Sequence, residues 1–209
     1  MAQTEHDLEG AYALRTPADS RRYYRDWAES YDSAFARATA YRSPGVIAAA
    51  YAGLGGRGPV LDVGAGTGLV GEALQGAGIG PVDGIDISAE MLAAAERKRV
   101  YRRTIQADLT QRLDLPDAAY AGCISAGTFT TGHVGPDAFG ELLRVAQPGG
   151  VFAVTVHSAF YEAAGFADAF AAMAGHIRDF RTEPFRIYGE GSAGDHGGDM
   201  GWIVSFRKA

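Results

Sequence analysis

VLDVGAGTGLVG, residues 60–71, contains two overlapping glycine patterns. Gly64, Gly66 and Gly68 form GxGxG, whereas Gly66, Gly68 and Gly71 satisfy the dinucleotide fingerprint GxGxxG. The apolar run before them predicts a buried strand. Glycine-rich backbone between a strand and a helix lets the main chain approach a ligand closely, because glycine lacks a Cβ. Both patterns therefore predict a nucleotide-containing ligand, and the alternative is a tight turn without one.

The charge around this loop bears on which ligand it holds. Residues 58–96 contain no Lys, Arg or His, whereas Asp62, Glu72, Asp83, Asp86 and Glu90 all fall within this range. A helix N-terminus alone can hold a pyrophosphate, so these acids only disfavour a nicotinamide dinucleotide. They favour S-adenosylmethionine, which carries a sulfonium and an ammonium group. We expect Asp62 to point toward the amino acid portion of that cofactor, and Asp86 to accept hydrogen bonds from two ribose hydroxyls.

The composition is that of an ordinary globular protein. With 209 residues, 47% hydrophobic and 21% charged, the chain suits one domain, predicted over 18–209 after an N-terminal tail at 1–17. It has neither an apolar run of membrane-spanning length nor a secretion signal, which predicts a cytoplasmic protein without a membrane partner. The net charge of −6 disfavours nucleic acid. The single cysteine, Cys123, lies in an apolar stretch that predicts a buried thiol. Small-molecule chemistry is favoured, and the oligomeric state is open.

Strand and helix patterns alternate along the chain. Apolar runs bounded by turn residues predict strands at 59–63, 81–87, 103–108, 120–127 and 151–157. Helical patterns fall at 18–38, from Ser43 to Gly53 or Gly55, and at 88–99, 136–147 and 159–174. Two further strand-like runs, 186–190 and 202–208, flank a glycine-rich segment and predict an antiparallel hairpin. The pattern predicts an α/β fold: a doubly wound, Rossmann-like seven-stranded sheet, mostly parallel with an antiparallel C-terminal hairpin strand.

Four motifs in this order carry a family resemblance. VLDVGAGTG at 60–68, GIDISAEML at 84–92, QADL at 106–109 and LLRVAQPGGVF at 142–152 resemble the motifs of class I S-adenosylmethionine-dependent methyltransferases. YYRDWAESYD at 23–32 and GTFTTGHVGPDAFGELLRV at 127–145 resemble, more narrowly, the Williams–Beuren-region methyltransferase-like group. The resemblance implies an S-adenosylmethionine-dependent methyltransferase with S-adenosylhomocysteine as product.

The resemblance also implies a set of cofactor-binding residues, each taken at the matching position. The glycine loop would line the methionine portion, Asp86 would hold the ribose, Ile87 and Met91 would pack on adenine, and Asp108 with Leu109 would bound its amino edge. Met91 has the alternative of ordinary core packing, and Asp108 that of capping a turn. The whole predicted set is Tyr23, Trp27, Tyr31, Asp62, Gly64, Ala65, Gly66, Thr67, Gly68, Asp86, Ile87, Met91, Ala107, Asp108, Leu109, Ser125 and Ala126.

The catalytic prediction is less complete. Methyl transfer is an in-line displacement, so positioning and exclusion of water can provide most of the catalysis. His133 and His157 follow the fourth and fifth strands and are the candidate bases, with structural hydrogen bonding as the alternative. These two histidines, Phe129 and Tyr161 are the candidate substrate-pocket residues. No metal is predicted, since a glycine-rich loop would not preorganise the metal-ligand types Asp195, His196 and Asp199.

The segment after the fourth strand narrows the acceptor. SAGTFTTG, residues 125–132, differs from the Asn/Asp-Pro-Pro-aromatic run of amino-methylating nucleic-acid enzymes. It also lacks the carboxylates by which catechol-type methyltransferases hold magnesium. A small organic acceptor is predicted, with oxygen, nitrogen or carbon as the methylated atom. Two other functions stay open: an S-adenosylmethionine-binding protein without catalysis, and an NAD-dependent oxidoreductase.

The segment ahead of the first strand has an aromatic face. Tyr24, Trp27 and Tyr31 stand at i, i+3 and i+7 of the predicted 18–38 helix. Residues 18–56 either pack on the domain as scaffold or close over the strand ends as a lid that excludes water. In the lid, Tyr23, Trp27 or Tyr31 would cover the methionine portion and gain roughly 0.5–2 kcal/mol of cation–π attraction.

Overall fold

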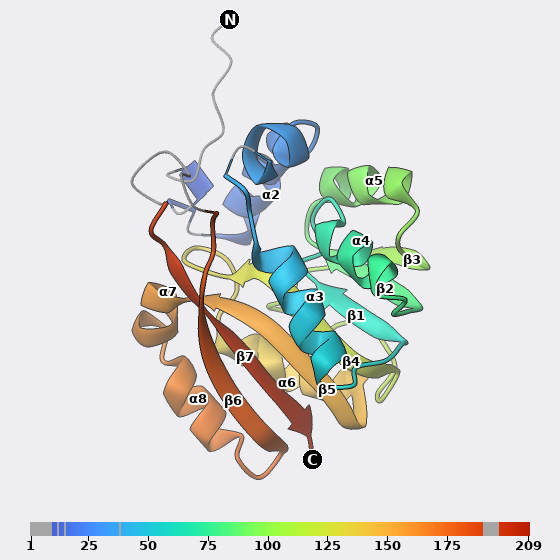
Figure 1. Cartoon of the computed structure of the whole chain (residues 1–209), viewed down its shortest axis with the longest axis vertical. Helices are drawn as coiled ribbons and strands as arrows, with labels where there is room; N and C mark the ends of the chain where they lie inside the picture. Colours follow the sequence, from blue (N-terminus) through green and yellow to red (C-terminus); the bar gives the residue numbers. More distant parts are fainter. Residues whose placement is uncertain (1–9, 12, 15, 38, 190–196) are drawn as a thin grey trace, which may run out of the picture.

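A seven-stranded sheet in the order β3-β2-β1-β4-β5-β7-β6 forms the centre of the computed structural model (Figure 1). The structure describes residues 10–11, 13–14, 16–37, 39–189 and 197–209. All neighbouring strands pair in parallel except β7, which is antiparallel to both β5 and β6. The predicted fold class is thereby confirmed. The strands are β1 (Val60–Val63), β2 (Val82–Asp86), β3 (Arg103–Gln106), β4 (Tyr120–Phe129), β5 (Ala146–His157), β6 (Ile177–Arg186) and β7 (Met200–Lys208).

Helices cover both faces of this sheet. This explains why all four residues of β1 are buried and why three of them are apolar, Asp62 being the exception. Val60 packs with α3 and α4 on one face, whereas Leu61 and Val63 pack with α6 on the other. Figure 1 shows α3 crossing in front of the sheet. The helices are α2 (Pro17–Trp27), the π-helix η1 (Tyr31–Ala36), α3 (Ser43–Gly53), α4 (Leu69–Gly76), α5 (Ala89–Lys98), the 3-10 helix η2 (Pro136–Ala138), α6 (Phe139–Val145), α7 (Ser158–Ala163) and α8 (Phe166–Ala172).

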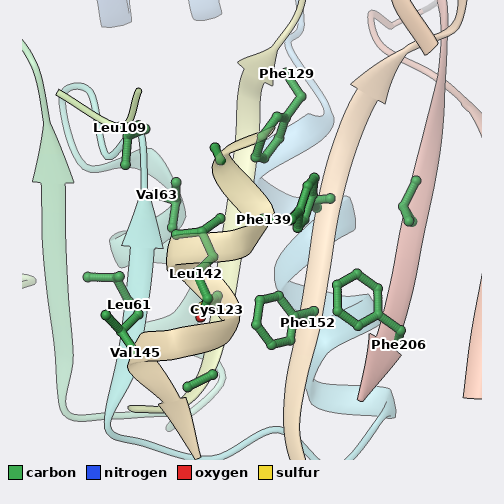
Figure 2. Close-up of a cluster of buried hydrophobic side chains, with 14 of the residues drawn as sticks. Leu61, Val63, Leu109, Cys123, Phe129, Phe139, Leu142, Val145, Phe152 and Phe206 are labelled. Atoms are coloured by element: carbon green, nitrogen blue, oxygen red, sulfur yellow. Dashed lines mark hydrogen bonds between the residues drawn. The ribbon is translucent and has the colours of Figure 1, made fainter. Parts of the chain in front are cut away.

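The largest cluster of core residues lies between α6, α8 and the sheet and includes several aromatic rings; Figure 2 shows its part around Phe139 and Leu142 of α6. Phe129 stacks on Phe139 with ring centroids 4.9 Å apart, and Phe152 stacks on Phe206 at 4.6 Å. Cys123 is fully buried beside them, which confirms the predicted structural thiol. This packing anchors the carboxyl ends of β4 and β5, where the candidate catalytic residues begin.

Several predicted boundaries were wrong. The 18–38 helix breaks after Trp27 into a turn and a π-helix, and the 159–174 helix breaks at Gly165, whose φ is +69°. Strand β5 begins at Ala146, so the Pro-Gly-Gly segment expected to end the preceding helix belongs to an extended strand. Strand β6 begins at Ile177, nine residues before the predicted run at 186–190, because its exposed polar residues conceal the strand pattern.

The topology places a crevice where β1 stands between β2 and β4. The chain winds outward from this point in both directions, and ligands of open α/β sheets bind there, outside the carboxyl ends of the strands. The parallel dinucleotide-binding order is 3-2-1-4-5-6, without an antiparallel strand inserted between the last two. The inserted β7 therefore separates this fold from that of the NAD-dependent alternative. Within the described residues, no helix has the length and apolar character needed to cross a bilayer.

Candidate cofactor and acceptor cavity

A cavity of about 180 Å³ lies in this crevice, covered by α2 and η1. Its wall includes most of the residues that the sequence predicted. Those predicted residues are Trp27, Tyr31, Gly64, Ala65, Gly66, Thr67, Asp86, Ile87, Met91, Asp108, Leu109, Ala126, Phe129, His133 and His157, whereas Tyr24, also on the wall, was not predicted. The structure thus brings the candidate cofactor and substrate residues to one place, and their roles in binding remain predictions.

The glycine loop takes the backbone conformation that its glycines permit. Gly64, Gly66 and Gly68 have φ values of +71°, +51° and +91°. A Cβ on Gly64 would lie 1.9 Å from the Thr128 hydroxyl oxygen, so no side chain fits between the loop and β4. A Cβ on Gly66 would meet no atom within 4 Å, and Gly66 lines the cavity. The loop therefore offers bare backbone to a ligand, as close approach of a cofactor requires.

Asp86 ties this loop to the end of β2. Its two carboxylate oxygens accept hydrogen bonds from the backbone N–H groups of Gly66 at 2.8 Å and Ser88 at 2.9 Å. Burial raises the pKa of Asp86, against the effect of these hydrogen bonds. The Ile87 backbone N–H also stabilises the charged form, and because a carboxylate has about four lone-pair sites, Asp86 keeps acceptor capacity on the cavity that it lines.

The next turn forms the opposite edge of this part of the cavity. Met91 is 2% exposed and lines the cavity with Ile87, so it serves both the core and the wall. Asp108 accepts hydrogen bonds from the Thr110 N–H and hydroxyl through Oδ1. Asp108 therefore caps the turn and also lines the cavity, and its contact with adenine stays a prediction.

We expected Asp62 to point toward the cofactor, but it does not line the cavity. Its side chain is fully buried beneath the glycine loop, and Oδ2 accepts a hydrogen bond from the Tyr101 hydroxyl at 2.5 Å. Burial raises the pKa of Asp62 to about 7. Tyr101 fills the space left by Gly71 and Gly84, where a Cβ would lie 2.7 Å or 2.8 Å from its ring. The last glycine of GxGxxG therefore provides room for packing rather than contact with a pyrophosphate.

Fewer acidic side chains line the cavity than the sequence alone suggested. Asp83 is fully buried on β2, where it accepts hydrogen bonds from Arg102, Arg103 and Tyr120. Although burial opposes the change, the two arginines lower the pKa of Asp83. Glu72 pairs with Lys98 at 2.7 Å. These contacts compensate the charges of Asp83 and Glu72 away from the cavity.

Five other predicted residues also lie off the cavity wall. The Ser125 hydroxyl donates to the Val63 carbonyl at 2.6 Å, because the strand alternation turns it into the sheet. Gly68 allows close packing, since a Cβ there would lie 3.2 Å from Ala95. Ala107 donates a backbone hydrogen bond to the Asp86 carbonyl. Tyr23 packs on Trp27, and Tyr161 packs on Phe166.

The cover over the cavity is attached by packing and by polar contacts. Trp27 is 2% exposed and packs with residues of the C-terminal hairpin, including Phe185 and Ile187. Asp32 of η1 accepts a hydrogen bond from the Thr67 hydroxyl at 2.5 Å and pairs with Lys98 at 2.6 Å. Residues 1–9 of the predicted tail lie outside the described part of the chain.

The two candidate bases differ in their surroundings. His133 Nε2 is 2.9 Å from the Tyr24 hydroxyl oxygen, and its Nδ1 is 2.9 Å from the Thr131 carbonyl oxygen. Burial lowers the pKa of His133. His157, at the end of β5, has Nε2 3.5 Å from an Asp199 carboxylate oxygen. Asp195 and His196 lie outside the described residues, among which no group of His, Cys, Asp and Glu side chains suits a metal ion.

Sequence reasoning missed one wall of the cavity. The missed residues include Ser20, Phe35, Tyr41, Ser43, Pro44, Thr128, Thr130, Thr155, Phe185, Ile187 and Tyr188. Phe185 and Ile187 alternate in the sequence, which is the period of a half-buried strand, and this was the signal available for them. The place of the other missed residues on the wall depends on contacts between segments that are distant in the sequence.

Comparison with known proteins agrees with this geometry. A family model described as a methyltransferase domain matches residues 61–154. The fold is similar to that of a solved structure from Thermotoga maritima, a SAM-dependent methyltransferase described as a possible histamine N-methyltransferase. The two superpose with a TM-score of 0.64 and share 16% sequence identity, over 90% of this chain and 98% of that one. These findings support a class I S-adenosylmethionine-dependent methyltransferase as the class of this chain, with S-adenosylmethionine as cofactor.

Two curated proteins are similar to this chain in sequence. Human Methyltransferase-like protein 27 is 30% identical over 156 residues, which is 72% of this chain and 63% of that protein. Malonyl-[acyl-carrier protein] O-methyltransferase of Pectobacterium atrosepticum is 38% identical over 94 residues, 45% of this chain and 36% of that protein. The chain thus spans less than two thirds of the length of either relative.

Proposed function

We propose that this chain transfers a methyl group from S-adenosylmethionine to a small organic acceptor by in-line displacement. The observation that carries the proposal is a single cavity whose wall changes character across the sheet. On the side of β2 and β3 it consists of the glycine loop, Asp86 and Asp108. On the side of β4 and β5 it consists of aromatic rings, small polar groups and two histidines. Two ligands in this cavity would lie side by side, shielded from water, as displacement requires.

The cofactor fits the first side on chemical grounds. The exposed backbone at Gly66 suits the methionine portion, and the unused lone pairs of Asp86 suit the ribose hydroxyls. Ile87 and Met91 offer an apolar surface for adenine, next to Asp108. When bound, the cofactor supplies a methyl group already activated by its sulfonium. The protein then needs to orient the acceptor and manage its proton.

The second side favours an acceptor of limited size. α2 and η1 cover this part of the cavity and enclose it. Trp27, Phe35 and Tyr41 contribute aromatic surface to its wall. These features support a small organic molecule rather than a polymer as the acceptor.

Binding of the cofactor is tested by calorimetry on the full chain with S-adenosylmethionine, S-adenosylhomocysteine and NAD in turn. Asp86→Ala removes an acceptor of charge-assisted hydrogen bonds, so the dissociation constant for S-adenosylhomocysteine should rise about 10- to 100-fold. Asp168→Ala, an exposed carboxylate on α8, is the charge-matched control and should bind as the wild type does. An unchanged constant for Asp86→Ala would contradict this assignment of the ribose site.

Transfer is tested with methyl-labelled cofactor and fractionated metabolite extracts. Label should appear in a small-molecule fraction and depend on Asp86. Cofactor binding without label in any fraction would favour a non-catalytic binding protein, and tight binding of NAD alone would favour an oxidoreductase.

A further inference from the structure

We infer that the methyl acceptor is a small amine, held as the free base against a row of aromatic rings that stabilises the positive charge its nitrogen gains. This aromatic row consists of Trp27, Tyr31, Phe35, Tyr41 and Tyr188. The inference rests on the proposed function, because it concerns the second ligand of the same cavity. It adds the chemical class of the acceptor and the residues that favour it.

The aromatic row is a continuous part of the cavity wall. Its ring centroids are 4.9 Å apart from Trp27 to Tyr31, 5.0 Å from Tyr31 to Phe35, 5.6 Å from Phe35 to Tyr41 and 6.0 Å from Tyr41 to Tyr188. All of these residues line the cavity. They come from α2, η1, the connection to α3 and the segment after β6. The row therefore runs from the cover to the C-terminal hairpin.

Aromatic rings favour cations among the ligands of a buried site. The π face of a ring carries partial negative charge, and a cation within about 6 Å of its centroid is attracted to it. The attraction is largest where water is excluded, and Trp27, Phe35 and Tyr188 are 2%, 7% and 3% exposed. Among the described residues that line the cavity there is no Lys or Arg, whereas the carboxyl groups of Asp86 and Asp108 are present. An anionic acceptor would be desolvated there without a cation to pair with.

Methyl transfer to an amine keeps one positive charge within this wall. The lone pair of the neutral amine nitrogen forms the new bond to the methyl carbon, the carbon–sulfur bond breaks, and its electron pair stays on the cofactor sulfur. The positive charge passes from sulfur to nitrogen, and no proton moves in this step. A product that carries an N–H proton loses it to water after release. The aromatic row therefore stabilises a cation both before and after transfer.

The hydrogen bonds of His133 also favour an acceptor that needs no base. Its Nε2 is 2.9 Å from the Tyr24 hydroxyl oxygen and its Nδ1 is 2.9 Å from the Thr131 carbonyl oxygen, so both ring nitrogens are engaged. A hydroxyl or carbon acceptor must lose a proton as the methyl group arrives, and a base in contact with it assists that loss. A neutral amine already has its lone pair. Its ammonium form is disfavoured beside the sulfonium, since two cations would then share one cavity.

A first test uses no turnover. Choline and 3,3-dimethylbutan-1-ol have the same shape, but only choline is a cation, so the pair isolates the effect of charge. In calorimetry on the full chain saturated with S-adenosylhomocysteine, choline should bind about 10-fold more tightly than the alcohol. With S-adenosylmethionine in its place choline should bind more weakly, because the sulfonium repels it. Equal affinities for the two probes, or choline binding that is the same with either form of the cofactor, would overturn the cation site.

Substitutions in the aromatic row sharpen this test. Phe35→Leu and Tyr188→Leu each remove one ring and keep an apolar side chain, so each should weaken choline binding about 3- to 30-fold and binding of the alcohol less than about twofold. Two variants are used because both rings also pack in the core, and one remains informative if the other fails to fold. Phe180→Leu, an exposed ring on β6 away from the cavity wall, is the matched control. An equal loss of affinity for both probes would show that the rings act by shape alone, against the inference.

A second test measures single turnovers with the compound labelled most strongly in the transfer test. The methyl label should be found on nitrogen. The rate should rise about tenfold per pH unit below the pKa of the amine, because only the free base reacts, and level off above it. On that plateau Phe35→Leu should lower the rate about 3- to 30-fold, while the dissociation constant for S-adenosylhomocysteine, which has no sulfonium, stays within about twofold. A wild-type rate more than about twofold slower in D2O than in H2O would overturn transfer to the free base, since it would show a proton moving in this step.

The outcomes separate the two proposals. Label on an oxygen or carbon atom of the best acceptor would overturn the inferred amine and leave methyl transfer standing. Label on nitrogen, with choline bound no better than the alcohol, would overturn the role of the aromatic row alone. No transfer by the wild-type chain to any acceptor would overturn the proposed function and, with it, the inferred class of acceptor.

Discussion

The two sides of the cavity are built in different ways. The cofactor side comes from short continuous segments, chiefly residues 64–70 and 86–91, and its shape depends on backbone dihedrals and hydrogen bonds to the main chain. The acceptor side is assembled from α2, the loop after β4 and the C-terminal hairpin, and its contacts join side chains distant in sequence. A backbone-defined site suits a constant ligand, whereas a side-chain-defined site can change its ligand by substitution at the surface of the same fold.

The largest effect should come from the glycine loop. Gly64→Ala places a Cβ at positive φ, which costs about 1–2 kcal/mol, and against Thr128, which costs about 1–3 kcal/mol more. Gly66→Ala has the positive φ but open space around it, so it should cost only about 1–2 kcal/mol. Urea denaturation of both variants measures the difference.

Titration with S-adenosylhomocysteine separates the two variants further. Gly66→Ala should weaken S-adenosylhomocysteine binding more than its small loss of stability implies, because its methyl group occupies the cavity side of the loop. Equal losses of stability in the two variants would contradict the asymmetry of the loop, and so would a fully stable Gly64→Ala.

The same contrast explains what could be predicted from the sequence. The glycine loop, the place of Asp86 and the start of α3 at Ser43 follow from local patterns, and the structure has them as expected. The partner of Asp62 could not be found in this way, since Tyr101 lies 39 residues further along the chain, in the connection between α5 and β3. The same is true of Asp83, which was counted among the acidic residues around the loop and which Arg102 and Arg103 compensate.

A second prediction concerns the buried carboxyl beneath the loop. The folded pKa of Asp62 is about 7, whereas the unfolded value is 3.8. The folded state therefore holds a proton that the unfolded state has lost, and stability falls as pH rises from about 4 to about 7. Between pH 5 and pH 7 this amounts to roughly 2–3 kcal/mol. Asp62→Asn removes the titration, so its stability relative to wild type should increase by that amount over the same interval.

Urea denaturation at pH 5 and at pH 8 measures this change. Tyr101→Phe removes a hydrogen bond that lowers the Asp62 pKa, so in that variant the fall in stability should extend to higher pH. Asp137→Asn, an exposed carboxylate near α6, is the control and should follow the wild type. A difference between Asp62→Asn and wild type that does not depend on pH would show that Asp62 is ionised throughout.

The smallest predicted effect concerns the attachment between the two sides, where Asp32 of the cover meets Thr67 of the glycine loop and Lys98 of α5. Asp32→Ala removes a hydrogen bond and a partly exposed ion pair, together worth about 1 kcal/mol. If the cover opens as a lid, amide hydrogen exchange over residues 17–36 should become about fivefold faster in this variant without ligand. It should slow in both proteins when S-adenosylhomocysteine is added. Glu29→Ala, exposed on the turn between α2 and η1, is the matched control. Exchange that is equally slow in all three proteins and indifferent to ligand would mean that the buried Trp27 cluster alone holds the cover, as fixed scaffold. The cavity would then be permanently covered, and acceptor entry would need another route.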